Sequence, residues 1–500
     1  MDYQEARMRF DEERRWAKNS ISQKHLDRQR ARGKRHVLER IHQLIDNGSW
    51  LEYGEFARAI EPIHKDKSPR DGTITGLGKV NGQSVAILAD DITTLGGTQS
   101  LVNERKVDRI LEIAVQNNFP IISLSEGGGV RLPDGIGVGF TRLCGLHKVG
   151  CLSTLANWRK RPLFICGVFG FTYGDPAFRS AMADITIMVE DSSAAVSAPV
   201  VIEAAISEKI SDEKLGGPLL HESTTGIADL VTKTEDEAID TIKRLINMFR
   251  PVEKTTDPPD RSTPSLESLV PHNNRLVYDM KKVIDNIVDH EEWIELKPRY
   301  GTGLITGLGR MAGRLTGILA SQPLSAGGAV DAKGLRKSAA FLDFVTKRRI
   351  PLFVIQDIPG FLIGSVVERD GMLNAIANHA RALDATDVPI VTLIIRKAYG
   401  AAYYFLGMGG SGAQFVAAWP NAEISFMSPE IGATVLTKNV ASEEKEEALK
   451  KTATELSRGA SIWEAAYEGW IDAVILPEET RKVICHAFQF ITESLSNNVL

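Results

Sequence analysis

The 500-residue sequence has few of the features that define several classes of protein. It contains four cysteines (Cys144, Cys151, Cys166 and Cys485), and no two of them form a CxxC pair. That usage argues against a zinc ribbon and for a reducing compartment. No apolar run reaches the roughly 18 residues that a membrane-spanning helix needs. The N-terminal segment mixes acidic and basic residues without the apolar centre of a signal peptide, so we expect a cytoplasmic protein.

An excess of basic charge is also missing. The chain has 59 Lys and Arg against 64 Asp and Glu, a net charge of −5, which argues against binding nucleic acid through overall basicity. There is no G-x-S-x-G nucleophile elbow, no Walker A loop and no histidine pair at metal-ligand spacing. We therefore predict no metal site, and a mechanism that uses backbone groups fits better than one built on side-chain catalysts.

A long internal repeat is the strongest positive feature. The pentapeptide ITGLG at residues 74–78 recurs at residues 305–309, an offset of 231. With that offset fixed and no gap, 16 of the 58 positions from residue 74 to residue 131 are identical in the two segments. Average composition would give roughly four identities. The chain is therefore predicted to contain two copies of one domain.

Both copies predict the same order of elements: a strand, a Gly-Gly loop, a helix with apolar residues at helical spacing, and two further strands. Alternating strands and helices with continuous apolar strands indicate an α/β fold around a largely parallel sheet. The predicted strands are residues 85–89, 120–124 and 163–168 in the first copy, and residues 316–320, 351–355 and 390–395 in the second.

The domain boundary is predicted from composition. Residues 251–271 carry five prolines among Thr, Ser and Asp, which is typical of a linker. We place the N-terminal domain at residues 1–250, with a charged helical arm at residues 1–46, and the C-terminal domain at residues 272–500. Each domain is long enough to bury its own hydrophobic core.

Four glycine-containing turns, two in each copy, follow apolar strands and are the candidate sites of chemistry. They are EGGGVR at residues 126–131, GFTYGD at 170–175, DIPGF at 357–361 and KAYGAA at 397–402. Glycine lets backbone N–H groups approach a ligand closely, and a following helix adds the positive end of its dipole. Two such turns aimed at one point would form an oxyanion hole for a thioester enolate or a tetrahedral adduct. The other interpretation is that these glycines only permit tight turns with positive φ.

At these turns the chain resembles a known family. The motifs DIPGFL (residues 357–362), RKAYG (396–400) and WPNAE (419–423) are similar to those of the carboxyltransferase (β) subunits of biotin-dependent acyl-CoA carboxylases, such as those for propionyl-CoA. The chain is also similar to the α subunits of glutaconyl-CoA and methylmalonyl-CoA decarboxylases. The resemblance covers nearly the whole chain and implies tandem duplicated crotonase-like domains of the ClpP/crotonase type.

The resemblance also implies a reaction and its residues. A carboxyl group would move between N1 of biotin, on a separate carrier protein, and the α-carbon of an acyl-CoA. Backbone amides would hold the thioester enolate and the biotin ureido oxygen, and the implied partners are a biotin carboxylase or carrier subunit and further copies of the chain in a homohexamer. Carried over by position, the oxyanion residues are Gly174 and Asp175 in one copy and Ala401 and Ala402 in the other, with supporting turns at Gly128, Gly129, Gly360 and Phe361.

Basic and aromatic residues near these turns are candidates for binding coenzyme A or its acyl group. Arginine and lysine suit the phosphates of coenzyme A. Tyr404 stands where the family often has a residue that sets substrate size. For the arm, the alternative is a solvated helix face with acidic partners. The basic candidates are Arg131 beside the first turn, Arg396 and Lys397 beside the fourth, and Arg32, Lys34 and Arg35 in the arm.

Departures from the family pattern leave alternatives open. Gly127 and Val130 replace a serine and an alanine of the first turn, and Asp175 puts a carboxylate where the family usually has glycine. A negative charge there opposes enolate formation unless it is turned away or protonated. The alternatives are a decarboxylase α subunit, a biotin-independent crotonase-like hydrolase or hydratase with Asp175 or Glu126 as acid–base group, and a non-catalytic acyl-CoA-binding scaffold.

Overall fold

Both halves of the chain build the same layered unit. The computed structural model divides the chain into Met1–Arg250 and Pro251–Leu500. It describes residues 2–19, 23–144, 155–157, 160–250, 257–263, 266–407, 409–441 and 443–493. Cys151 and residues 251–256 of the predicted linker lie outside the described residues.

The first unit is built on a seven-stranded sheet in the order β1-β2-β3-β4-β5-β7-β9. Strands β1 to β3 pair antiparallel, and each later pair is parallel. Two short strands, β6 and β8, form a separate parallel pair. The strands are β1 (Leu51–Tyr53), β2 (Thr73–Val80), β3 (Gln83–Asp90), β4 (Ile121–Ser125), β5 (Phe164–Val168), β6 (Phe171–Tyr173), β7 (Ile185–Val189), β8 (Ser193–Ala195) and β9 (Leu230–Thr232).

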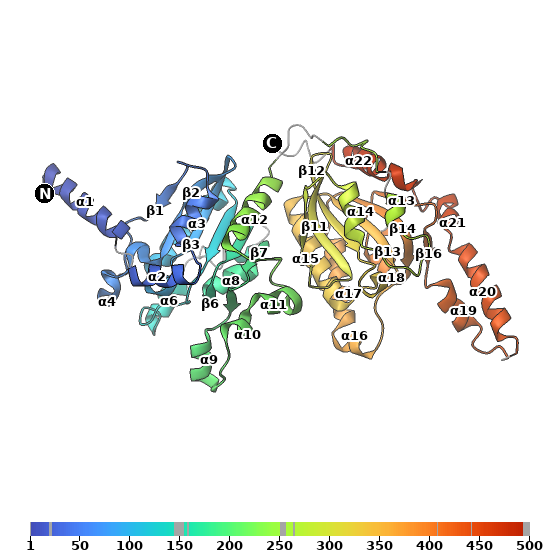
Figure 1. Ribbon diagram of the computed structural model, residues 1–500, viewed down its shortest axis with the longest axis horizontal. Helices are drawn as coiled ribbons and strands as arrows, with labels where there is room; N and C mark the ends of the chain where they lie inside the picture. The colour runs from blue at the N-terminus through green and yellow to red at the C-terminus, as the bar shows by residue number, and fades with distance from the viewer. Residues whose placement is uncertain are drawn as a thin grey trace. The chain divides into compact units, whose positions relative to one another are not determined.

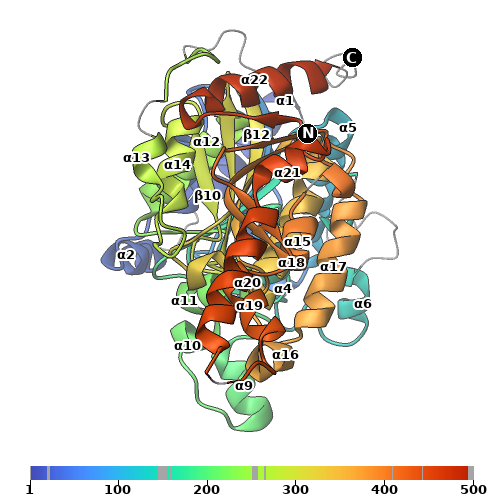
Figure 2. The ribbon, with the colours of Figure 1, turned by 90° about the vertical axis from the view of Figure 1, so that its right-hand side faces the viewer.

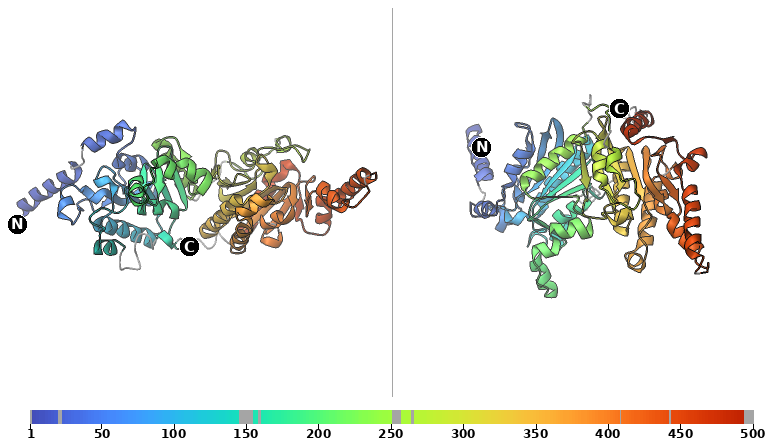
Figure 3. Two further views of the ribbon diagram at one scale, coloured as in Figure 1. Left: turned by 90° about the horizontal axis from the view of Figure 1, so that it is seen from below. Right: turned by 45° about the vertical axis from the view of Figure 1, so that its right-hand side comes forward.

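Helices cover both faces of this sheet (Figure 1). α5 (Leu101–Asn117) and α8 (Asp175–Met182) pack on one face, where Ile110 and Leu111 join the core formed by β3, β4 and β5. α3 (Val37–Leu44) and α12 (Glu235–Met248) pack together on the other. The other helices are α1 (Tyr3–Asn19), which extends as an arm from this unit (Figure 3), α2 (Gln23–Ala31), α4 (Pro62–Lys65), α6 (Val138–Cys144), α9 (Pro199–Ile206), α10 (Asp212–Gly216) and α11 (Pro218–Leu220).

The second unit repeats this plan with the sheet order β10-β11-β12-β13-β14-β15-β17, and β16 pairs with the end of β14. α13, α14 and α22 pack on one face, and α15 lies beside α17 on the other (Figure 2). Its strands are β10 (Trp293–Leu296), β11 (Leu304–Met311), β12 (Arg314–Ser321), β13 (Leu352–Ile358), β14 (Ile390–Tyr399), β15 (Phe415–Ala418), β16 (Glu423–Ser425) and β17 (Ala473–Val474). Its helices are α13 (Leu266–Leu269), α14 (Met280–Ile287), α15 (Ala332–Arg348), α16 (Ser365–Arg369), α17 (Met372–Asp384), α18 (Gly400–Phe405), α19 (Pro429–Leu436), α20 (Lys445–Gly459), α21 (Ile462–Tyr467) and α22 (Thr480–Ile491).

The sequence repeat corresponds to a structural repeat. β2, β3 and α5 recur as β11, β12 and α15 at the same offset of 231 and with the same lengths. The α/β fold class is therefore confirmed. Part of the predicted linker is folded into the second unit, since Leu266 and Val270 are buried in its core and Arg481 donates to the carbonyl of Asp257 at 3.1 Å. No helix of the described residues is long and apolar enough to cross a membrane.

Candidate functional site

The two turns of the first unit meet. Gly129 follows β4 and Gly174 follows β6, and both have positive φ (79° and 65°), which glycine adopts without steric cost. A Cβ atom built on Gly129 would lie 3.1 Å from the Tyr173 carbonyl oxygen and 3.7 Å from the Gly174 Cα. A hydrogen bond from the Tyr173 N–H to the Gly127 carbonyl, at 2.9 Å, joins the same two turns.

Backbone donors remain available where these turns meet. The Gly128 N–H donates to Gly96, and the Gly174 N–H makes a long bond of 3.3 Å to the Ala195 carbonyl. Within the described part of the chain, the N–H groups of Gly129 and Asp175 have no acceptor. Asp175 is the first residue of α8, where N–H groups have no partner inside the helix. An anionic oxygen near both donors would be stabilised by them and by the helix dipole.

The second unit has an equivalent pair of turns. Gly360 has φ 130°, and a Cβ atom built on it would lie 4.0 Å from the Tyr399 carbonyl oxygen. Phe361 forms an isolated parallel β-bridge with Val330, and the corresponding residues of the first unit, Val130 and Gln99, form the same bridge. Ala401 and Ala402 belong to the first turn of α18, and no described residue accepts a hydrogen bond from their N–H groups.

The Asp175 carboxylate is held by side chains of its own unit. Its Oδ2 accepts a hydrogen bond from Gln99 Nε2 at 2.6 Å and lies 3.4 Å from Arg179 Nε. Arg179 is one helical turn further along α8 and also binds Asp90. The hydrogen bond from Gln99 and the ion pair with Arg179 hold the carboxylate that the sequence placed beside the oxyanion site, and they leave it poorly suited to act as a general acid or base.

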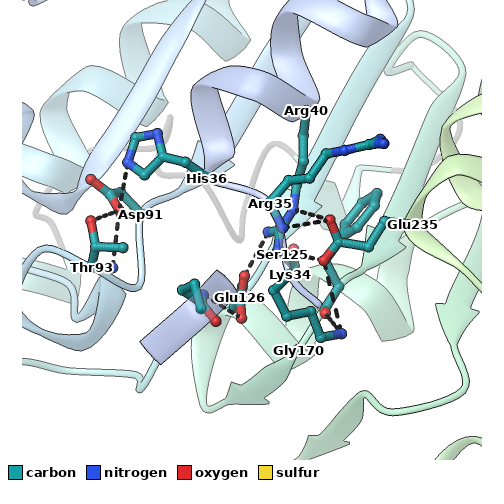
Figure 4. A network of polar contacts seen from close by, with 12 residues as sticks. Lys34, Arg35, His36, Arg40, Asp91, Thr93, Ser125, Glu126, Gly170 and Glu235 are labelled. Carbon is teal, nitrogen blue, oxygen red and sulfur yellow. Dashed lines mark hydrogen bonds and ion pairs between the residues drawn. The ribbon is translucent and has the colours of Figure 1, made fainter. Parts of the chain in front are cut away.

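Glu126, at the start of the first turn, lies in a buried ionic network (Figure 4). Arg40 of α3 donates to Glu126 Oε2 at 2.5 Å and to the two oxygens of Glu235 at 2.7 and 3.0 Å. Gln29 donates to Glu126 Oε1 at 3.1 Å. Burial alone would lower the pKa of Arg40, but Glu126 and Glu235 together raise it above its ordinary value. Glu126 therefore anchors the arm to the turn.

The arm residues divide into two groups. Lys34 is buried and forms an ion pair with Asp191, and Arg35 pairs with Asp236. The alternative of acidic partners thus describes Lys34 and Arg35 better than phosphate binding does. Arg32 is exposed, and its guanidinium carbon lies 5.5 Å from the ring centroid of Phe171, the first residue of β6. Unlike Lys34 and Arg35, Arg32 has no ion-pair partner among the described residues.

Two predicted ligand-binding arginines are buried instead. Arg131 donates to Asp71 Oδ1 at 2.5 Å and to the Thr98 carbonyl at 2.8 Å. Arg396 is fully buried, binds Asp357 at 2.8 Å and donates to three backbone carbonyls of residues 271–276. Their guanidinium groups are occupied by these partners, so we correct the prediction that they bind substrate and give them a structural role.

Lys397 lies differently from its neighbour Arg396. It lines a cleft of about 710 Å³ together with Tyr399, Glu423 and the start of α19. Its Nζ donates to the Asn274 carbonyl at 3.1 Å and lies 3.5 Å from Asp357. Tyr399, directly before the fourth turn, donates from its hydroxyl to Glu423, and burial together with that carboxylate raises the pKa of Tyr399. Lys397 therefore remains a candidate for binding an anionic group.

An aromatic cluster lies beside the fourth turn. The rings of Phe361 and Phe405 are 6.2 Å apart, and Tyr404 contacts Phe405 edge-on at 5.4 Å. The Tyr404 side chain is 45% exposed, so its ring is accessible to a ligand at the turn. This geometry agrees with a role in limiting the size of the bound group.

Sequence reasoning did not identify Gln99, Arg179 and Asp90 as supports of the turn. They lie 76, 4 and 85 positions from Asp175, and only the folded chain brings them together. The internal repeat contained one signal of these supports. Gln99 aligns with the apolar Val330, and the charged Asp90 aligns with the small Ser321, so the two copies differ in polarity at these positions.

Two crotonase-like units in one chain, each with paired turns at strand ends, define a tandem crotonase-fold carboxyltransferase. The chain belongs to the carboxyl transferase domain family, which it matches over residues 28–498. This confirms the resemblance inferred from the motifs, and the chain is an enzyme of that class.

Individual relatives agree with this assignment. The chain is 34% identical to the propionyl-CoA carboxylase beta chain of Roseobacter denitrificans over 477 residues, covering 93% of this chain and 92% of the relative. It is 31% identical to the methylmalonyl-CoA decarboxylase subunit alpha of Veillonella parvula, covering 95% and 93%. The transcarboxylase 12S structure, a hexamer with methylmalonyl-coenzyme A bound, is similar at a TM-score of 0.89 and 27% identity, covering 98% of this chain and 96% of that one.

Proposed function

We propose that the chain is a carboxyltransferase subunit that moves a carboxyl group between carboxybiotin on a separate carrier protein and the α-carbon of an acyl-CoA. The observation that carries this proposal is the meeting of two strand-end turns in each unit, with backbone N–H groups that have no other acceptor among the described residues. Such preorganised donors stabilise an oxygen on which negative charge develops.

The turns of the two units stabilise different oxygen atoms. In the first unit, Gly174 and Asp175 hold the thioester oxygen as the α-carbon becomes nucleophilic, and the Gly128–Gly129 turn supports them. In the second, Ala401 and Ala402 face the biotin ureido oxygen, supported by Gly360 and Phe361. Carboxybiotin supplies the carboxyl group when its carrier docks. The protein's own contribution is orientation and backbone electrostatics, which agrees with the ion pairing of Glu126 and Asp175.

Arg32 and Lys397 are the basic residues that we assign to ligand binding. Arg32 is exposed beside β6, and Lys397 lines the cleft next to the fourth turn. We expect Arg32→Ala to raise the KM for the acyl-CoA with little change in kcat, because a phosphate contact contributes equally to substrate and transition-state binding. Arg35→Ala, which removes a residue paired with Asp236, is the matched control and should leave KM unchanged.

A homohexamer is the assembly that we infer for this chain. Transcarboxylase 12S, the similar structure, is a hexamer. Exposed apolar residues on α9 and α19, such as Val200 (71% exposed) and Val435 (60% exposed), suit contact between copies. Light scattering should give six times the mass of one chain, and Val435→Asp should reduce that mass. A wild-type protein that is monomeric at micromolar concentration would overturn this inference.

The proposed reaction is tested by carboxyl exchange. Purified protein is incubated with free biotin and malonyl-CoA or methylmalonyl-CoA, and loss of the carboxylated thioester is followed. Turnover that depends on biotin supports carboxyl transfer, and a panel of acyl-CoAs then defines the pocket. Turnover without biotin would support the hydrolase alternative, and binding of coenzyme A without any turnover would support the scaffold alternative.

A further inference from the structure

A buried polar network lies behind the Gly174 turn. Asp175 accepts from Gln99, and Arg179 lies between the carboxylates of Asp175 and Asp90. Arg179 Nη2 is 2.9 Å from each oxygen of Asp90, and the side chains of Arg179 and Asp90 are each 1% exposed. Such a burial of charge is costly unless each charge is paired, so the network fixes the rotamers of its members.

The second unit provides an internal comparison. The strand pairs β6–β8 and β14–β16 are equivalent, and this places Gly400 at the position of Gly174. At the position of Asp175 the second unit has alanine, and its counterparts of the network are apolar or small. The correspondences are Gln99 with Val330, Asp90 with Ser321, Asp175 with Ala401 and Arg179 with Phe405. Among the described residues, this set of polar side chains is therefore present behind the Gly174 turn and absent behind the Gly400 turn.

Glu104 of α5 is an acidic residue that interacts electrostatically with Asp175. Burial and the neighbouring Asp175 raise the pKa of Glu104 to about 8. A raised pKa disfavours a further negative charge beside Asp90 and Asp175, whose carboxylates the guanidinium of Arg179 faces.

We propose that Arg179 is a positioning residue for the carboxyl transfer, which with Gln99 holds the Asp175 carboxylate behind the turn so that only the Asp175 backbone N–H faces the thioester oxygen. This inference rests on the proposed function. A carboxylate free to rotate toward that oxygen would oppose the negative charge of the enolate. The network thus explains how this chain accommodates an aspartate at the turn position where the resemblance implies glycine.

The decisive experiment pairs a loss with a rescue. Arg179→Met should lower kcat in carboxyl exchange by about 100-fold, the usual effect of disabling one oxyanion donor, with little change in KM. Asp175→Gly in the same background should restore kcat to within about tenfold of the wild type, because no carboxylate then needs to be held. Arg109→Met, which removes an exposed arginine of α5, is the control for charge loss and should leave kcat unchanged.

A purely structural role for Arg179 gives a different pattern, in which kcat stays low in the double variant. That outcome would overturn the proposal. If Arg179→Met does not fold because Asp90 loses its partner, Gln99→Val, which introduces the residue of the second unit, replaces it and must show the same rescue by Asp175→Gly.

Failure of the proposed function is distinguishable from failure of this inference. Absence of biotin-dependent turnover in the wild type contradicts the function. A double-mutant cycle on thermal unfolding tests the contact between Arg179 and Asp175 without an activity assay. Arg179→Met must lower the midpoint temperature of unfolding less in the Asp175→Gly background than in the wild type. Equal losses in both backgrounds would show that Arg179 does not hold Asp175.

Discussion

Removal of the Arg40 guanidinium should destabilise the first unit far more than removal of any exposed arginine. The Arg40 side chain is 1% exposed and makes three charge-assisted hydrogen bonds to Glu126 and Glu235 (Figure 4). Arg40→Leu leaves both carboxylates buried. Lys34 remains 3.9 Å from Glu235, but among the described residues Glu126 keeps only the neutral amide of Gln29 as a side-chain donor. Breaking a buried ion pair from one side costs about 3–5 kcal/mol.

Hydrogen exchange measured by mass spectrometry on the full chain reads out this loss. Peptides from β4 should lose roughly 100-fold or more in protection, since about 1.4 kcal/mol corresponds to a factor of ten. Peptides from β13 in the second unit serve as the internal reference. Arg30→Leu is the matched control, because Arg30 is 63% exposed and lies 4.0 Å from its partner Glu39, and it should change protection by less than about fivefold.

The physical reason is tested by removing the stranded charges as well. Replacing Arg40, Glu126 and Glu235 together by leucine should recover most of the protection, since apolar residues replace a buried ionic group at little cost. Protection of β4 that is unchanged in Arg40→Leu would refute the claim that this network anchors the arm to the turn.

Three further variants test other parts of the account. Gly129→Ala should reduce carboxyl exchange at least tenfold, because its Cβ would lie 3.1 Å from the Tyr173 carbonyl oxygen and would move the two turns apart. Gly82→Ala is the control: Gly82 has a similar φ of 80° and open space around it, so this change should lower stability without lowering activity. Equal activities of the two variants would contradict the turn geometry. The pKa of Glu104, about 8, exceeds its value in the unfolded chain, so the free energy of unfolding should fall as pH rises from about 4.5 to 8. Glu104→Gln should flatten this pH dependence of the unfolding free energy by about 1 kcal/mol or more. An unaltered pH dependence would contradict the raised pKa. Tyr404→Ala should raise kcat/KM for longer acyl-CoAs relative to acetyl-CoA, and an unchanged ratio would show that this exposed ring does not limit the acyl group.

Much of the architecture follows from local pattern. The 231-residue repeat, the apolar strands and the glycine positions are properties of neighbouring residues, so they predicted β3, β4, β5 and α5 and their counterparts in the second half, whereas β2 and β11 were not predicted as strands. The four turns were predicted for the same reason, because each follows an apolar strand directly. Positive φ at Gly129 and Gly174 required glycine there, and the sequence contains it.

The binding partners of the charged side chains could not be predicted in this way. Arg40 and Glu126 are 86 positions apart, and Arg35 and Asp236 are 201 apart. Such pairs form only when the fold brings distant segments together. An arginine beside a strand end, such as Arg396, therefore looks the same in sequence whether it binds a ligand or a buried aspartate. Composition likewise marked residues 251–271 as linker, although Leu266 packs into the core of the second unit.

The central claim is that backbone amides of the paired turns, and not side chains, hold the reacting oxygens. The most direct measurement is an experimental structure of the protein with a stable analogue of an acyl-CoA enolate. The analogue's oxygen should lie about 2.7–3.1 Å from the Asp175 N–H nitrogen in the first unit, with the Asp175 carboxylate still in contact with Gln99 and Arg179. An oxygen bound by the carboxyl group of Asp175 or Glu126, away from both turns, would contradict it.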